Sequence, residues 1–149
     1  MAKKVVRVTT EEEKEDAFKI REKVFMEEQD VPEELEWDGY DDESIHFVAY
    51  DGEKPVGAAR IRQYGETGKT ARVERVSVVE SRREEGWGRL IMEKIEEVAL
   101  NEGFELLTLS SQTHAQGFYE KMGYRTVSDV FEEEGTGIPH VKMVKEIDV

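Results

Sequence analysis

A short apolar strand, a turn with two glycines and a helix follow one another between Val76 and Glu97. The turn holds Arg83, Gly86 and Gly88. Because glycine has no Cβ, successive backbone N–H groups in such a turn can point toward one place. The helix behind it adds unpaired N–H groups and the positive end of its dipole. This order of residues predicts a binding site for the phosphate of a ligand.

A charged residue also falls on an apolar helix face. Arg21 shares a stripe with Phe18 and Phe25, and a charge on a buried face needs a partner. One interpretation is an internal ion pair with an acid from residues 27–43. The other is that Arg21 binds a substrate carboxylate or phosphate through its planar guanidinium group, assisted by Arg75. The sequence leaves both open.

The composition narrows the class of protein. The 149 residues carry a net charge of −14, which disfavours a nucleic-acid surface because such surfaces need clustered Lys and Arg. No apolar run is long enough to span a membrane, and the first residues lack the apolar segment of a secretory signal. We therefore expect a cytoplasmic protein without nucleic-acid or membrane partners. The acid excess either solvates the surface or attracts cationic substrates such as amines.

The cysteine and histidine content limits which covalent and metal-binding sites the protein can contain. Cysteine is absent, which excludes disulfides, thiolate metal ligands and a cysteine nucleophile. The three histidines, His46, His114 and His140, lack metal-ligand spacing. The sequence predicts no metal.

Strands and helices alternate along residues 1–149, which we expect to form a single domain. Strands are predicted at Lys4–Thr9, His46–Asp51, Lys54–Tyr64, Thr70–Val79, Phe104–Leu109, Tyr124–Val130 and His140–Ile147. Helices are predicted from about Thr10 to Phe25, from the glycine turn to about Asn101, and over Ala115–Met122, with residues 27–43 irregular. This order predicts an α/β (α+β) fold with a mixed sheet and helices on both faces.

Five stretches together resemble one family. They are R-x-x-G-x-G (Arg83–Gly88), F-Y-E-K-M-G-Y (Phe118–Tyr124), R-E-K-V-F-M-E-E-Q-D-V-P (Arg21–Pro32), L-S-S-Q-T-H-A-Q-G-F-Y (Leu109–Tyr119) and G-I-P-H (Gly137–His140). With the order of elements, they resemble the GNAT superfamily of acyl-CoA-dependent N-acetyltransferases, and most of all its small bacterial ElaA-like and YjcF-like branch. The resemblance implies a mostly antiparallel sheet of about seven strands flanked by about four helices, and a possible homodimer.

The resemblance also implies acetyl-CoA as co-substrate. Its diphosphate would bind the glycine turn, its pantetheine arm would pair with the preceding strand, and a backbone N–H near Val76 would polarise the acetyl carbonyl. That strand and Phe104–Leu109 would splay apart to admit the thioester. The cofactor-binding residues expected on this basis are Val76, Ser77, Val78, Arg83, Glu84, Glu85, Gly86, Trp87, Gly88, Arg89, Ser110, Gln112 and Phe118.

Four of these residues depart from the usual pattern of the family. Glu84 and Glu85 place carboxylates beside a diphosphate, which weakens binding unless they point to solvent. Trp87 replaces a small aliphatic residue, and either packs under the helix or covers the cofactor. Ser110 stands where many members have an asparagine, and its hydroxyl has a shorter reach.

Three side chains are candidates for proton transfer. Tyr119 matches the family's general acid, which returns a proton to the leaving thiolate, although its spacing alone favours core packing. Glu74 is a candidate base, or else a strand carboxylate paired with Arg72 or Arg75. His140 is a second candidate base, because histidine titrates near neutrality, or else a structural histidine.

The leading hypothesis is therefore an enzyme that transfers an acetyl group from acetyl-CoA to a small primary amine by direct transfer in a ternary complex. A second hypothesis is an acyl-homoserine-lactone-synthase-like enzyme. The pattern formed by Arg21, Phe25, Trp37, Asp38 and Asp41 resembles that family, although this chain is short for a member of it. A third is an acyl-CoA sensor domain without catalysis.

Overall fold

The computed structural model describes residues 2–148 and contains an eight-stranded sheet in the order β1-β2-β3-β4-β5-β8-β6, with β7 paired to β8. The strands are β1 (Lys3–Arg7), β2 (Ile45–Asp51), β3 (Lys54–Gln63), β4 (Thr70–Val78), β5 (Leu106–Gln112), β6 (Arg125–Thr126), β7 (Phe131–Glu132) and β8 (Pro139–Glu146). The α-helices are α1 (Glu11–Arg21), α2 (Glu33–Glu36), α3 (Trp87–Asn101) and α4 (Gln116–Lys121). All strand pairs are antiparallel except β4 with β5. The predicted fold class is confirmed.

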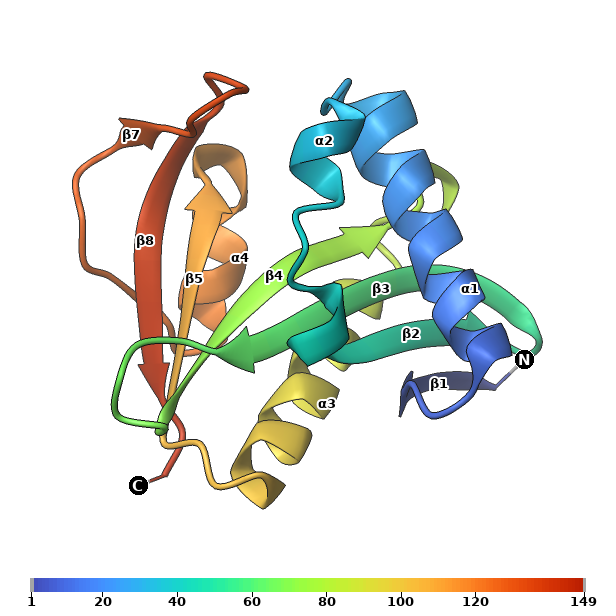
Figure 1. The fold of residues 1–149 in the computed structure, drawn as a ribbon, viewed down its shortest axis with the longest axis horizontal. Helices are drawn as coiled ribbons and strands as arrows, with labels where there is room; N and C mark the ends of the chain where they lie inside the picture. Colours follow the sequence, from blue (N-terminus) through green and yellow to red (C-terminus); the bar gives the residue numbers. More distant parts are fainter. Residues whose placement is uncertain (1, 149) are drawn as a thin grey trace.

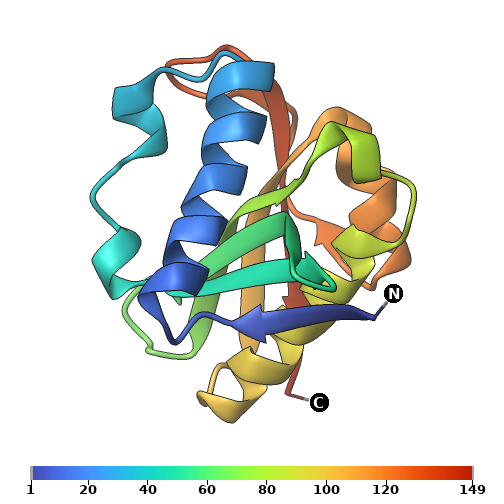
Figure 2. The same cartoon turned by 90° about the vertical axis from the view of Figure 1, so that its right-hand side faces the viewer.

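Helices α1 and α3 cover opposite faces of the sheet (Figures 1 and 2). A capping box starts α1, since the Thr10 hydroxyl accepts the Glu13 N–H at 3.1 Å and the Glu13 carboxylate accepts the Thr10 N–H at 3.2 Å. The helix then continues without a break as the seven-residue π-helix η1 (Glu22–Glu28). On the other face, α3 buries Ile91, Ile95 and Ala99 completely against the sheet.

Strand β4 carries the two irregularities that open the site. Its register against β3 shifts between Glu74 and Ser77, because two residues of β4 there oppose one of β3. Arg75 lies in this bulge at φ 59°. On its other side, β4 pairs with β5 only as far as Arg72 and Thr108, although both strands continue. Beyond that point the strands diverge (Figure 1), as the resemblance implied.

Two regions differ from the elements predicted. Residues 27–43, expected to be irregular, contain the end of η1, helix α2 and the 3-10 turn η2 (Asp41–Glu43). The strand predicted over Tyr124–Val130 is reduced to β6, and a further short strand, β7, follows it. Its valines had suggested a strand, but Val130 is 63% exposed, and the Ser128 hydroxyl takes the Lys142 N–H at 2.8 Å. A side chain thereby replaces the backbone partner and ends the pairing.

Candidate active site

A cavity of about 1250 Å³ lies between the diverging ends of β4 and β5. The glycine turn and the start of α3 line one part of it, and residues of η1, β4, β5, α4 and the segment before β8 line the rest. Of the cofactor-binding residues predicted from the resemblance, all line this cavity except Glu85. The structure thus brings together residues from five separate stretches of the sequence.

The glycine turn has the geometry of an anion cradle. Glu84 lies at φ 66° and Gly86 at φ 88°, so the chain turns through left-handed conformations before α3 begins at Trp87. No side chain caps the start of α3, which leaves its first N–H groups available to a ligand. Gly88 lies where a Cβ would meet the Phe118 ring at 3.1 Å. The residues present therefore fit a bound diphosphate.

Glu85 and Trp87 are hydrogen-bonded to each other beside that cradle. The Glu85 carboxylate accepts hydrogen bonds from the Trp87 indole at 2.9 Å and from Arg82 at 3.0 Å, and these contacts lower its pKa. The Lys3 ammonium binds the Glu85 carbonyl oxygen. The Trp87 side chain is buried and so packs under the helix. Of the two glutamates in the turn, only Glu84 faces the cavity.

Arg83 is held by a partner that the sequence did not reveal. Its Nη1 and Nη2 donate to the two carboxylate oxygens of Glu28 at 2.6 and 2.7 Å, and its Nε donates to the Val78 carbonyl at 3.0 Å. The next residue, Gln29, accepts a hydrogen bond from Gln112 on β5 at 3.1 Å. The end of η1 therefore bonds both to the glycine turn and to β5.

Tyr119 lies in the cavity wall on α4. Its ring packs against Phe118 and Tyr124, with centroids 5.0 and 5.8 Å away. Its hydroxyl makes no hydrogen bond to a described side chain or backbone group, and burial raises its pKa to about 12. The phenol is thus protonated at neutral pH and has no protein acceptor, as a proton donor requires.

Glu74 lies on β4 among arginines. Its carboxylate is 2.7 Å from Arg62, 3.1 Å from Arg60 and 3.3 Å from Arg72. Burial alone would raise its pKa, but the hydrogen bond from Arg62 and the positive charges outweigh burial, so the pKa is lowered. A carboxylate held in this way is a weak base. Of the two partners expected from the sequence, Arg72 contacts Glu74.

His140 is held from both sides by the hairpin between β7 and β8. The Ile138 carbonyl lies 2.8 Å from Nδ1, so Nδ1 carries the proton and donates it. The Nε2 atom lies 3.4 Å from a carboxylate oxygen of Glu133. The Phe131 ring stacks on the imidazole with centroids 6.0 Å apart. The ring lines the cavity in one fixed orientation.

Arg21 lies in the internal ion pair that was one of its two interpretations. Its Nε donates to the Glu36 carboxylate at 2.7 Å, Nη1 to Asp41 at 2.6 Å and Nη2 to the Glu36 carbonyl at 3.0 Å. Its side chain is 1% exposed and does not line the cavity. This arrangement does not support the predicted contact with substrate, because every guanidinium nitrogen already has a protein acceptor.

Arg21 belongs to a larger group of charges, which we term the arginine network. Arg60 is fully buried and contacts Asp38 at 2.6 Å and Asp41 at 2.8 Å. Burial alone would raise the pKa of Asp38, but the Arg60 hydrogen bond, with backbone and charge contacts, lowers it to about 2. The members of the network are Arg21, Arg60, Arg62, Arg72, Arg75, Glu36, Asp38, Asp41 and Glu74. It fixes the segment of α2 and η2 onto β3 and β4.

The family model described as "Acetyltransferase (GNAT) domain" matches residues 7–147. The chain belongs to this family. An uncharacterised N-acetyltransferase of Bacillus subtilis, YjcF, is 46% identical over 96% of this chain and 99% of its own length. A crystal structure from Lactobacillus plantarum, assigned as an N-acetyltransferase, superposes with a TM-score of 0.88 at 29% identity, over 99% of both chains. Escherichia coli ElaA superposes with a TM-score of 0.82 at 27% identity, over 97% and 99% of the two chains. These similarities confirm the GNAT family and the ElaA/YjcF-like branch.

Three side chains of this GNAT site escaped the sequence analysis. Glu28, Gln29 and Glu133 contact Arg83, Gln112 and His140 respectively. Each contact joins residues from different elements or from the two sides of a turn, and nothing in local spacing marks it. Among residues 2–148, no helix is long and apolar enough to cross a membrane, and no group of three or more acidic or histidine side chains could hold a metal ion.

Proposed function

We propose that the protein transfers an acetyl group from acetyl-CoA to the primary amine of a small molecule, by direct transfer in a ternary complex. One observation carries the proposal: the uncapped start of α3, the diverging ends of β4 and β5, and Tyr119 all line the same cavity. A GNAT fold relative, an aminoglycoside 6′-N-acetyltransferase at 18% identity and a TM-score of 0.74, forms a crystal complex with coenzyme A.

The cofactor end of the cavity is proposed to bind through backbone groups. N–H groups of the turn between Arg83 and Arg89 would hold the diphosphate, and the free edge of β4 beyond Arg72 would pair with the amide-bearing pantetheine arm. The bulge frees backbone polar groups near Val76 from the ladder. A free N–H there would polarise the acetyl carbonyl, an interaction whose loss typically costs about 10²–10³ in rate.

Two proton transfers accompany the reaction. The amine nitrogen forms a bond to the acetyl carbon, the carbon–sulfur bond breaks, and the nitrogen loses one proton. Tyr119 gives its proton to the departing sulfur. A base must accept the proton from nitrogen, and the phenolate regains one from solvent. The ordinary pKa of a tyrosine is already near 10, so burial, which raises it further, keeps Tyr119 in the donor form.

His140 is the better candidate for the base. Its Nδ1 carries a proton that Ile138 accepts, which leaves the lone pair of the neutral ring on Nε2. Once Nε2 is protonated, the Glu133 carboxylate at 3.4 Å stabilises the positive ring. Glu74 is instead neutralised by three arginines. We propose His140, directly or through a water, as the base.

The test measures acetyl-CoA-dependent release of free thiol with a library of primary amines. Tyr119→Phe is expected to lower kcat by about 10²–10⁴ without weakening coenzyme A binding. Tyr124→Phe is the matched control, because the Tyr124 hydroxyl is buried in the same aromatic cluster and has no hydrogen-bond partner. Unchanged turnover in Tyr119→Phe would reject the assignment of the acid. Binding of acetyl-CoA without thiol release from any amine would instead favour a sensor domain.

A further inference from the structure

The permanently charged basic side chains that line the cavity are all of one residue type. Apart from two histidines, every basic side chain among the described residues that line it is an arginine: Arg62, Arg72, Arg75, Arg82, Arg83 and Arg89. Lysine is about as frequent as arginine in the chain, yet none lines the cavity. Arginine is the residue suited to planar, two-point binding of carboxylates and phosphates, whereas lysine acts as a point charge.

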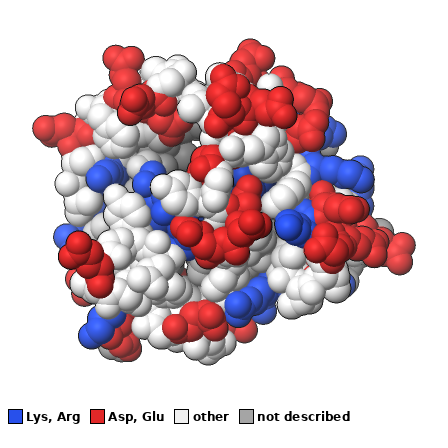
Figure 3. Space-filling model, in the orientation of Figure 1, with Lys and Arg blue, Asp and Glu red and all other residues white. Residues whose placement is uncertain are grey.

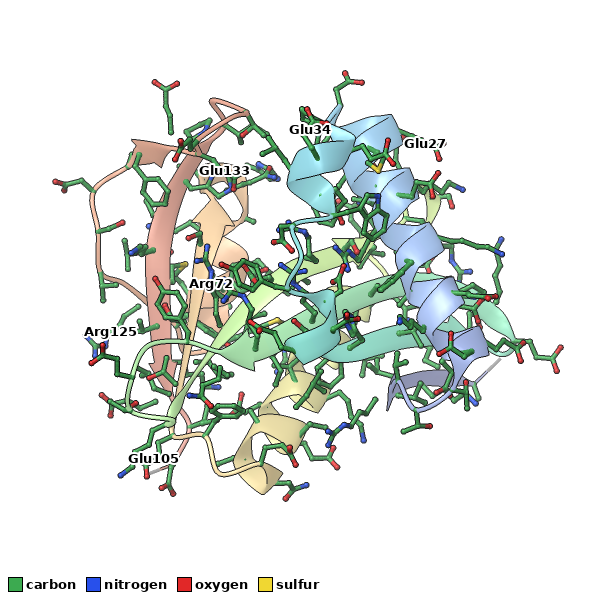
Figure 4. The ribbon with its side chains drawn as sticks, viewed as in Figure 1. Glu27, Glu34, Arg72, Glu105, Arg125 and Glu133 are labelled. Carbon is green, nitrogen blue, oxygen red and sulfur yellow. The ribbon has the colours of Figure 1, made fainter. Side chains whose placement is uncertain are left out.

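These arginines form two groups at opposite ends of β4 and its turn. Arg82, Arg83 and Arg89 lie around the glycine turn, where the proposed cofactor carries phosphate. Arg62, Arg72 and Arg75 lie on β3 and β4 beside the acceptor part of the cavity. Figure 4 labels Arg72 close to the point at which β4 and β5 meet. The proposed transfer reaction gives the second group no role.

The charges of the arginine network do not balance. Its arginines contribute five positive charges and its carboxylates four negative charges at most. Burial raises the pKa of Glu36, one of these four carboxylates, despite the neighbouring arginines. Arg21 and Arg60 are almost completely buried. The arginines of the network that line the cavity are Arg62, Arg72 and Arg75, so an anion that balances the network would bind beside them.

Arg72 and Arg75 have the two most exposed side chains among the arginines of the network. Arg72 has the most exposed side chain of the five, at 30%, and its single ion pair with Glu74 spans 3.3 Å without a hydrogen bond. Arg75 donates from Nη2 to Leu35 and Asp38. Its Nε lies 3.0 Å from Glu36 but lacks hydrogen-bond geometry, so the distance reflects an ion pair alone. The terminal nitrogens of Arg72 and the Nη1 of Arg75 have no hydrogen-bond acceptor among the described residues.

We propose that the acceptor amine also carries an anionic group, a carboxylate or a phosphate, and that Arg72 and Arg75 bind this group. The inference rests on the proposed acetyl transfer and names its substrate class. Two acidic residues of the segment before β8, Glu133 and Glu134, also line the cavity, and Figure 4 shows Glu133 well separated from Arg72. An acceptor with one ammonium and one anionic group matches both signs. Figure 3 shows more acidic than basic groups on this face of the molecule.

The spacing of the two arginines sets the range of acceptors to test. Arg75 adjoins Val76, where the acetyl carbonyl is proposed to lie, and Arg72 lies four residues before Val76 on the same strand. At about 3.3 Å per residue, Arg72 and Val76 are at most roughly 13 Å apart. The panel should therefore include α-amino acids, amino acids with a longer amine-to-carboxylate separation, and aminoalkyl phosphates.

Each anionic acceptor is compared with the matched amine that lacks the anionic group, by kcat/KM for thiol release. Charge-assisted hydrogen bonds of this kind are expected to favour the anionic member by about 10- to 100-fold. Arg72→Gln should collapse that ratio toward one, while Arg125→Gln, an exposed arginine outside the cavity, should keep it. Glu74 retains Arg60 and Arg62 in Arg72→Gln, so the variant keeps its buried ion pairs, and thermal unfolding checks this.

A wild-type ratio near one, or an equal loss for both members in Arg72→Gln, would overturn the inference. If thiol is released from neutral amines only, the acetyl transfer stands and the anionic acceptor fails. If no amine releases thiol, acetyl transfer fails, and calorimetric binding of the same matched pairs in the presence of coenzyme A decides the inference. Preference for the anionic member that Arg72→Gln abolishes would then support it, and equal or absent binding would reject it.

Discussion

At one end of the cavity, the groups proposed to face the cofactor come from the seven consecutive residues between Arg83 and Arg89 and are largely backbone N–H groups. The other end is lined by side chains from several elements, and those of β3 and β4 are fixed by ion pairs with residues 36–41. A backbone cradle needs only a permitted set of φ angles. A side-chain site needs every partner in place, because a buried charge without its partner is costly. We therefore expect mutations at the acceptor end to act on stability, and mutations at the cofactor end to act on affinity.

The largest effect is expected for Arg60→Ala. The side chain is fully buried and contacts Asp38, Asp41 and Glu74, so its removal takes one positive partner from each of three carboxylates and leaves a buried space. We expect a loss of about 3–5 kcal/mol in the free energy of unfolding, measured in urea. Arg83→Ala removes a partly exposed pair with Glu28 and should cost less than about 1 kcal/mol. Equal losses of unfolding free energy in the two variants would contradict the proposed difference between the two ends of the cavity.

A smaller loss of stability is expected when the pH is lowered. The folded-state pKa of Asp38 is about 2, below its usual value of 3.8. Its contribution to stability is therefore fully present above the unfolded pKa and is lost as the pH falls toward 2. Between pH 7 and pH 2.5, the loss of this contribution should lower the free energy of unfolding by about 2 kcal/mol. Unfolding experiments at the two pH values should show that Asp38→Asn lacks this part of the decrease. Burial raises the pKa of Glu36, so Glu36 has the opposite effect. Its contribution to the stability of the folded state decreases as the pH rises.

A substitution can strain the backbone of the cradle without changing its charge. Gly86→Ala places a Cβ at φ 88°, which costs about 1–2 kcal/mol in a left-handed conformation, and we expect coenzyme A binding to weaken by about 5- to 30-fold. Gly39→Ala is the matched control, because Gly39 has the same φ of 88° and open space around it but does not line the cavity. Both variants should lose similar stability. A similar loss of affinity in both would contradict the assignment of the cradle.

The smallest effect is expected for Glu28→Gln. The Glu28 carboxylate occupies both terminal nitrogens of Arg83, and so competes with any phosphate for them. Removing its charge should tighten coenzyme A binding by a few-fold, as expected for a partly exposed pair worth less than about 1 kcal/mol. Binding of a short acetyl thioester without the diphosphate should not change. Weaker coenzyme A binding would show that Glu28 covers the cofactor rather than competes with it.

The same contrast explains which parts of the molecule the sequence could predict. The glycine turn, α3 and the order of strands depend on residues close together in the chain, and the motifs there predicted the family and the fold. The residues that hold Arg83, Gln112 and His140 come from different segments or from turns, and the path of residues 27–43 depends on ion pairs with β3 and β4. The exposed Val127 and Val130 show the converse, since the regular pairing with β8 ends at Thr126 despite their strand propensity.

The π-helix η1 makes chain length a determinant of the site. Each residue of an α-helix turns the chain by about 100°, and a π-helix accommodates an extra residue within such a run. Deleting one residue between Glu22 and Glu28 would restore α-helical winding and rotate the following side chains by about that angle. Glu28 and Gln29 would then face away from Arg83 and Gln112. A relative one residue shorter in this helix would lack both bridges even if every side chain in them were kept.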